Sequence, residues 1–191
     1  MTDATTTAAT AAAPARRRAL ELAGIVAGAL AVALASQVAV PLPGTPVPMT
    51  LQALAVLLAG GLLGARRGAA SLVLYLVLGA SGLPVFTPYG APGLARLFGP
   101  TGGYLLAYPF AAALVGWVVA RFPGWKGLVA GPVLGMIAVH AGGLAQLVVL
   151  TGSARLAFTA GTVPFVLEDT VKAGLAALIL RRTMRLTRAL R

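Results

Sequence analysis

Apolar positions in this chain gather into long segments, and polar positions are mostly confined to the short stretches between them. Four of the segments have ~20 residues, the length that an α-helix needs to cross a bilayer about 30 Å thick. The pattern predicts an all-α integral membrane protein with six transmembrane helices, and counts of five or seven fit it less well. The six segments run at about 19–40, 51–64, 68–82, 103–121, 127–150 and 163–180.

The second and third segments are shorter than the others. The break between them, Gly64-Ala65-Arg66-Arg67-Gly68, is a tight turn that carries two charges. Helices this short cannot each span a bilayer alone. We therefore expect them to pack inside a bundle.

The two ends of the chain differ from this membrane domain, which we place at residues 16–183. Residues 1–15 are rich in Ala and Thr, a composition that predicts a disordered tail. Residues 184–191 form a basic tail. The arginines at 16–18 before an apolar run could mark a signal peptide, but the run is longer than the 7–15 residues of such peptides and others follow it. It is therefore interpreted as the first transmembrane helix.

Composition excludes most other classes of protein. Residues of the AVILMFWYC set make up 59% of the chain and charged residues only 10%, too few polar side chains to cover a soluble domain. The net charge is +11, but the charges lie between apolar segments rather than along one face, so nucleic acid is not a predicted partner. The chain has no Cys, which removes disulfides and thiolate chemistry.

The distribution of Lys and Arg predicts the orientation. Twelve of the 15 lie before the first segment, in the 2–3 and 4–5 connections, and after the sixth segment. Six helices place all these stretches on one face, which the positive-inside rule makes cytoplasmic. Both termini are therefore predicted to be cytoplasmic.

Polar residues at membrane depth are costly, so the few that occur are candidates for function. Asp169 and Lys172 are three residues apart and would share a helix face, where they can pair. Glu168 and Asp169 lie at the external start of the last segment. The group is explained equally well by an interfacial ion pair that orients the helix or by a binding site.

Three further polar residues lie in apolar segments. Gln52 opens the second segment and is either a polar helix start or a ligand contact. His140 and Gln146 lie in the fifth, where interhelical hydrogen bonds or ligand contacts explain them. A single His with no Cys and no carboxylate near it in the sequence predicts no metal site. No Ser, His and Asp set can be assembled either, so we do not expect an enzyme.

The longest external loop, residues 83–102, has features of a lid. It is rich in Gly and Pro and contains Arg96. Its glycines allow irregular turns and close approach of the backbone to a ligand. A loop of this length inside a compact domain is usually functional.

The first segment carries alanine at every fourth position, a pattern of small residues that marks a packing face in lipid. Packing within the bundle and contact with a partner subunit both explain it. The row consists of Ala23, Ala27, Ala31, Ala35 and Ala39.

Four short runs, in the order in which they occur, resemble the BioY family, the biotin-binding S components of energy-coupling-factor (ECF) transporters. The resemblance covers roughly residues 20–180. The runs are Val47-Pro48-Met49-Thr50-Leu51-Gln52, Gly79-Ala80-Ser81-Gly82-Leu83-Pro84-Val85-Phe86, Gly99-Pro100-Thr101-Gly102-Gly103-Tyr104-Leu105 and Pro164-Phe165-Val166-Leu167-Glu168-Asp169-Thr170-Val171-Lys172.

The resemblance implies an S-component-like bundle that captures biotin outside the cytoplasmic membrane of a prokaryote. A transmembrane coupling subunit and two cytoplasmic ATPases would complete the transporter, with Ala27, Ala31 and Ala35 facing the coupling subunit. No ATP-binding motif and no cofactor site is present in this chain. The sequence departs from the usual family pattern at Glu168, where glycine often precedes the aspartate.

The site residues that the resemblance implies match the chemistry of biotin. Asp169 would accept the ureido N–H, while Lys172 or Gln52 would donate to the ureido oxygen. Arg96 would meet the carboxylate or tie down the loop, and the opposite pose, with Lys172 on the carboxylate, fits almost as well. Phe86, Tyr75 and Tyr104 would supply the walls, and Gly102, His140 and Gln146 complete the candidate set.

Three alternatives stay open at this point. The first is an S component for another small vitamin. The second is a biotin transporter that works without partners, perhaps as a homo-oligomer. The third, a membrane protein outside transport, does not account for Arg96, Asp169 and Lys172 on the same external side.

Overall fold

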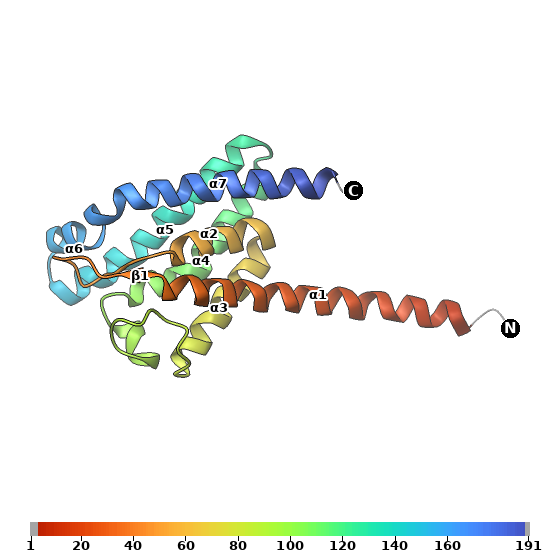
Figure 1. The fold of residues 1–191 in the computed structure, drawn as a ribbon, viewed down its shortest axis with the longest axis horizontal. Helices are drawn as coiled ribbons and strands as arrows, with labels where there is room; N and C mark the ends of the chain where they lie inside the picture. Colours follow the sequence, from red (N-terminus) through yellow and green to blue (C-terminus); the bar gives the residue numbers. More distant parts are fainter. Residues whose placement is uncertain (1–3, 190–191) are drawn as a thin grey trace.

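The computed structural model describes residues 4–189, and side-chain environments for residues 15–184. Within these residues the chain is a bundle of helices linked by short turns and two longer loops (Figure 1). The helices are α1 (Ala4–Gln37), α2 (Gln52–Leu63), α3 (Ala65–Ala80), α4 (Gly102–Arg121), α5 (Trp125–Thr151), α6 (Ala154–Gly161) and α7 (Val166–Ala189).

The longer loops contain small elements of their own. Strands β1 (Ala39–Val40) and β2 (Met49–Thr50) pair antiparallel after α1. A 3-10 helix, η1 (Gly93–Phe98), lies in the loop between α3 and α4. A second one, η2 (Val163–Phe165), joins α6 to α7.

Each predicted apolar segment overlaps one of the six longer helices. Among the described residues, three helical stretches are long and apolar enough to cross a membrane, at Ala15–Gln37, Gly102–Arg121 and Trp125–Thr151. The structure adds the short helix α6 in the connection at 151–162. It also continues α1 back to Ala4, into the segment for which the composition predicts a disordered tail.

Small residues allow the central helices to pack closely. Helix α4 packs against α2, α3 and α5. A Cβ added at Gly60 of α2 would overlap the carbonyl group of Ala112 on α4, and one at Gly103 of α4 would overlap that of Gly142 on α5. Small side chains at such crossings let backbones approach in a membrane protein.

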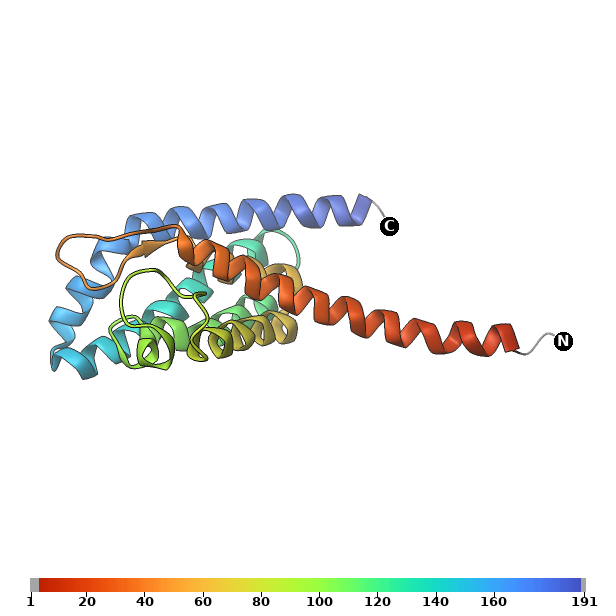
Figure 2. The ribbon, with the colours of Figure 1, turned by 60° about the horizontal axis from the view of Figure 1, so that its bottom comes forward.

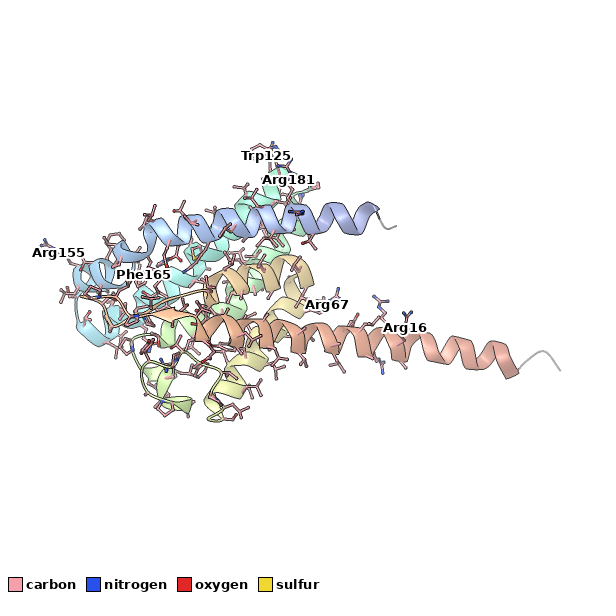
Figure 3. All side chains as sticks on the ribbon, in the orientation of Figure 1. Arg16, Arg67, Trp125, Arg155, Phe165 and Arg181 are labelled. Carbon is pink, nitrogen blue, oxygen red and sulfur yellow. The ribbon has the colours of Figure 1, made fainter. Side chains whose placement is uncertain are left out.

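The two ends of the bundle differ. Both chain ends lie at one end, which we call the terminal end, and α6, the β1–β2 hairpin and the loop before α4 lie at the other, the loop end (Figures 1 and 2). Arg16, Arg67 and Arg181 lie toward the terminal end and Arg155 lies at the loop end (Figure 3). Three of the four labelled arginines thus lie at the same end as the chain termini.

Helix α1 covers α2 and α3 with one face only. Ala29, Val32 and Ser36 are buried against the bundle. The alanines of the predicted packing row lie on a different face: Ala27 and Ala31 are exposed and Ala35 is half-buried. Ala27 and Ala31 therefore do not pack inside this chain, whereas Ala39, the last member of the predicted row, lies beyond the end of α1 and pairs with Thr50 in the β1–β2 hairpin.

Candidate functional site

A pocket opens at the loop end between α2, α4, α5 and α7. The enclosed part of the pocket measures about 60 Å³, and the space free of protein atoms rises to about 590 Å³ when the solvent at its mouth is included. Its polar lining comes from Thr50, Gln52, Thr87, Thr101, His140, Glu168, Asp169 and Lys172. Its apolar lining comes from Val47, Pro48, Ala53, Phe86, Tyr104, Leu105, Tyr108, Met136, Val139 and Phe165.

The first turns of α7 supply the charged wall of this pocket. Lys172 is 7% exposed, and its Nζ donates to Glu168 Oε1 at 2.6 Å and to Asp169 Oδ1 at 3.2 Å. The predicted pairing of Asp169 with Lys172 is thus confirmed. The structure adds Glu168 as a second partner, so the ammonium group is shared between two carboxylates.

Asp169 is also bound from another helix. His140 Nε2 on α5 lies 2.7 Å from Asp169 Oδ2, and His140 Nδ1 lies 3.3 Å from the Thr162 hydroxyl. Nε2 is therefore placed to donate to the carboxylate, and Nδ1 lies within hydrogen-bond distance of the hydroxyl. No carboxylate lies near His140 in the sequence, but the fold brings Asp169 to it from 29 residues away.

Gln52 lies at the start of α2 and is 4% exposed. Its Nε2 donates to the Tyr75 hydroxyl at 2.5 Å, and Thr50 Oγ1 lies 3.4 Å from its Oε1. Tyr75 itself is fully buried and does not line the pocket. Its expected role as a wall is therefore corrected: it packs behind Phe86, ring edge to ring face at 5.4 Å, and orients Gln52.

Two contacts fix the orientation of the Tyr104 side chain in the pocket. Its hydroxyl donates to the carbonyl oxygen of Gly161 at 2.6 Å, and its ring meets the His140 ring edge-on at 6.1 Å. A Cβ at Gly143 of α5 would overlap this ring. Glycine at that position therefore makes room for the aromatic wall.

Arg96 is buried within its own loop and does not line the pocket. Its Nε donates to the carbonyl of Ala91 at 2.8 Å, and its Nη2 to the carbonyl of Thr87 at 2.8 Å. Its Nη1 donates to Thr87 Oγ1 and to the carbonyl of Tyr89. Burial lowers the pKa of this guanidinium, yet arginine is basic enough to stay charged at neutral pH. Of the two expected roles, the structure supports tying down the loop.

Gln146 and Gly102 also act on the loop rather than on the pocket. Gln146 Nε2 donates to the carbonyls of Leu97 and Gly99, at 3.0 and 2.6 Å. A Cβ at Gly102 would overlap the Leu97 carbonyl, so only glycine lets the loop close onto the start of α4. Neither residue lines the pocket, which corrects their expected placement as ligand contacts.

The candidate set therefore divides into two groups. Gln52, Phe86, Tyr104, His140, Asp169 and Lys172 line the pocket, whereas Tyr75, Arg96, Gly102 and Gln146 stand behind them. Sequence reasoning missed the threonines at 50, 87 and 101 and the apolar residues of α5, Met136 and Val139. Thr50 and Thr101 lie inside the motifs it quoted, and Met136, Val139 and His140 fall at helical spacing on one face of α5.

This pocket can bind a compact, mostly apolar molecule that carries a few polar groups. Asp169 and Glu168 accept hydrogen bonds, Gln52 and Lys172 donate them, and the rings of Phe86 and Tyr104 flank the space. Within residues 4–189, no group of three or more His, Asp or Glu side chains has an arrangement that could hold a metal ion. The fold and the site together define a helical membrane protein with a binding site for a small organic solute.

Comparison with known proteins narrows this class. The model of the BioY family matches residues 5–189, and the chain belongs to that family. A probable biotin transporter BioY of Pyrococcus horikoshii is 38% identical over 137 residues, which cover 72% of this chain and 80% of the relative. The biotin transporter BioY of Thermotoga maritima is 37% identical over 76% of this chain and 85% of the relative.

A solved structure has the same architecture. The crystal structure of the S-component for biotin from an ECF-type ABC transporter superimposes with a TM-score of 0.80 at 28% identity. The match covers 89% of this chain and 93% of that one. The expected resemblance to this family is thereby confirmed.

Proposed function

We propose that this chain captures biotin at the external face of the membrane and serves as the substrate-binding subunit of an ECF-type transporter. One observation carries the proposal. In a BioY-family chain, a buried carboxylate, Asp169, is held by His140 and Lys172 at the wall of a pocket flanked by Phe86 and Tyr104. Biotin offers a ureido ring, an apolar bicycle and a carboxylate, and these match the donors, acceptors and rings present. We assign the chain no catalytic role.

Charge neutralisation around Lys172 favours one of the two poses. Its ammonium group already contacts two carboxylates, Glu168 and Asp169, so it is a poor receptor for a third. We therefore place the ureido ring against Asp169 and Gln52. The ligand carboxylate then points toward Thr101 at the start of α4, where a helix N-terminus favours an anion. Arg96 acts indirectly, by holding the loop over the pocket.

The membrane arrangement follows from the helices and the charges. We propose that the six longer helices traverse the cytoplasmic membrane of a prokaryotic cell and that both termini are cytoplasmic. Twelve of the 15 Lys and Arg residues belong to the predicted cytoplasmic stretches, and the pocket lies at the opposite end. In this orientation the pocket faces the external medium.

Energy for transport must come from partners or from a gradient, because the sequence contains no ATP-binding motif. We propose a transmembrane coupling subunit and two cytoplasmic ATPase subunits as partners. The outward row Ala27, Ala31 and Ala35 on α1 would be the contact with the coupling subunit, since small residues allow close helix approach.

A ligand panel tests the assignment of the substrate. Purified chain in detergent is heated alone and with biotin, thiamine, riboflavin or folate, and the midpoint of unfolding is recorded. A ligand that binds only the folded state raises this midpoint. We expect biotin alone to raise it. A rise with another vitamin and none with biotin would show an S component with a different substrate.

A further inference from the structure

A second cavity lies at the terminal end, far from the proposed biotin pocket. It is an open groove of about 880 Å³ between the α2–α3 turn, the α4–α5 turn and α7. We call it the terminal groove and define it by Leu62, Gly64, Arg67, Gly124, Trp125 and Arg181. The proposed biotin site does not use any of these residues.

Two helices begin at this groove, and neither is capped by a side chain. Gly64 precedes α3 and Gly124 precedes α5; both have positive φ, at 81° and 84°, and neither helix has a side-chain cap hydrogen bond. The first N–H groups of a helix have no intrahelical partner. Together with the helix dipole they make a helix N-terminus attractive to an anion.

The charges near these helix starts are the reverse of the usual preference. Acidic side chains are favoured in the first turn of a helix, yet α3 and α5 have none there. Instead Arg66 and Arg67 lie in the first turn of α3 and Lys126 in that of α5. Such cations repel the positive end of the dipole, so both helix starts would gain from a bound negative charge.

The chain itself offers these cations almost no acidic partner. Its four acidic residues are Asp3, Glu21, Glu168 and Asp169. Glu168 and Asp169 lie in the biotin pocket at the loop end, and Glu21 pairs with Arg17 at 3.5 Å. Asp3 lies outside the described residues. Among the residues that the structure describes, no acidic side chain lines the groove.

The groove also has apolar walls, and these favour a phospholipid over a free phosphate ion as the source of the negative charge. Leu62, Leu63, Val119 and Leu128 line it beside the two arginines. Trp125 is 69% exposed and lines the same groove as Arg181. It lies at the start of α5, and exposed Trp residues are enriched at membrane interfaces. A free phosphate ion would leave these apolar walls uncovered, whereas a phospholipid brings both a phosphate and hydrocarbon chains.

We propose that the terminal groove binds one anionic phospholipid, with its phosphate between Arg67, Arg181 and the starts of α3 and α5. Its acyl chains lie along the apolar wall formed by Leu62, Val119 and Leu128. Basic pockets between membrane helices bind anionic head groups for the same physical reason. The site does not depend on the identity of the transported ligand.

Native mass spectrometry of the full chain with added lipids tests this proposal. Palmitoyl-oleoyl phosphatidylglycerol and the matching phosphatidylcholine are titrated onto wild type, onto the groove variant Arg67→Gln/Arg181→Gln and onto Arg16→Gln/Arg18→Gln. The last variant loses the same charge from α1, also at the terminal end but outside the groove. A monodisperse size-exclusion profile and an unchanged unfolding midpoint confirm that each variant is folded, and titration with labelled biotin reports on the proposed function separately.

We expect one phosphatidylglycerol to bind tightly to wild type, and the groove variant to bind it about fivefold more weakly per arginine removed, as for one basic residue near an anionic surface. The α1 variant should change this affinity less than twofold. Equal losses in both variants, or no preference over phosphatidylcholine, would overturn the proposal. Displacement of the lipid by inorganic phosphate would show a site for small anions and would overturn it as well.

Discussion

His140 on α5 and Asp169 on α7 lie 2.7 Å apart, and this contact joins two helices at the wall of the pocket. Asp169 thereby uses one carboxylate oxygen for the imidazole and the other for Lys172. The carboxylate is held in one orientation before any ligand arrives. A preorganised acceptor of this kind loses little entropy on binding.

Asp169→Asn removes the negative charge of the side chain that contacts His140 and Lys172, and it keeps the shape of that side chain. We expect biotin affinity to fall about 10- to 100-fold, because hydrogen bonds to charged groups are worth about 1.5–3 kcal/mol. Isothermal titration of the detergent-purified chain measures this. Thr170→Val is the matched control on the neighbouring position, which is exposed and outside the pocket. An affinity within twofold of wild type for Asp169→Asn would remove this residue from the site.

Arg96→Lys keeps the positive charge and loses the fork that reaches three backbone carbonyls. The loop over the pocket should then open more often, and biotin should dissociate faster. Since Arg96 does not meet the ligand carboxylate in this account, biotin and its methyl ester should be affected equally. Stopped-flow measurement of both dissociation rates checks this. A loss confined to biotin would place Arg96 on the carboxylate.

We expect Gly143→Ala to distort the pocket, because position 143 packs against the ring of Tyr104. The added Cβ would overlap the Tyr104 ring and push it into the space for the ligand. Overpacking of this kind costs about 1–3 kcal/mol, so biotin should bind about tenfold more weakly. Gly174→Ala on α7 is the control, because a Cβ there has no atom within 4 Å. Both variants gain the same helix propensity, so a difference between them reports the Tyr104 contact alone.

Tyr75→Phe tests the support of Gln52. It removes the hydroxyl that accepts from Gln52 Nε2 and leaves a buried donor without its partner, which costs about 1–3 kcal/mol of folding stability. The midpoint of thermal unfolding in detergent should therefore fall. Tyr89→Phe, at a half-exposed loop position, should leave it unchanged. If the two variants unfold at the same temperature, the Gln52–Tyr75 bond carries no stability.

Ala31→Trp places a large side chain in the outward row of α1. Biotin binding should be unchanged, since α1 does not line the pocket. Copurification of the coupling subunit, and with it biotin uptake, should be lost. Leu178→Trp at an exposed position of α7 is the control. Normal uptake by the Ala31 variant would place the partner elsewhere.

The sequence predicts the helices well because long apolar segments at helical length have few other solutions in a membrane. It also predicts the Asp169–Lys172 pair, since residues three apart on a helix share a face. The sequence pattern does not predict helix α6. The eight residues of this helix include polar positions and lie within a predicted loop. A short amphipathic turn of this kind leaves no long apolar signal.

The contacts that organise the site depend on how helices rotate against each other, which a periodic pattern does not reveal. His140 meets Asp169 only because α5 packs against α7. Tyr75, Arg96 and Gln146 have the residue types of ligand contacts, yet their polar atoms bind neighbouring protein groups instead. The sequence therefore singles out these polar residues, but it does not reveal that their side chains lie behind the pocket wall.

The most direct test of the central claim is a titration of labelled biotin into the purified, partner-free chain, alongside Asp169→Asn. The account predicts saturable binding of one biotin per chain for wild type and a weaker curve for the variant. A folded, monodisperse wild-type sample that binds no biotin would contradict it.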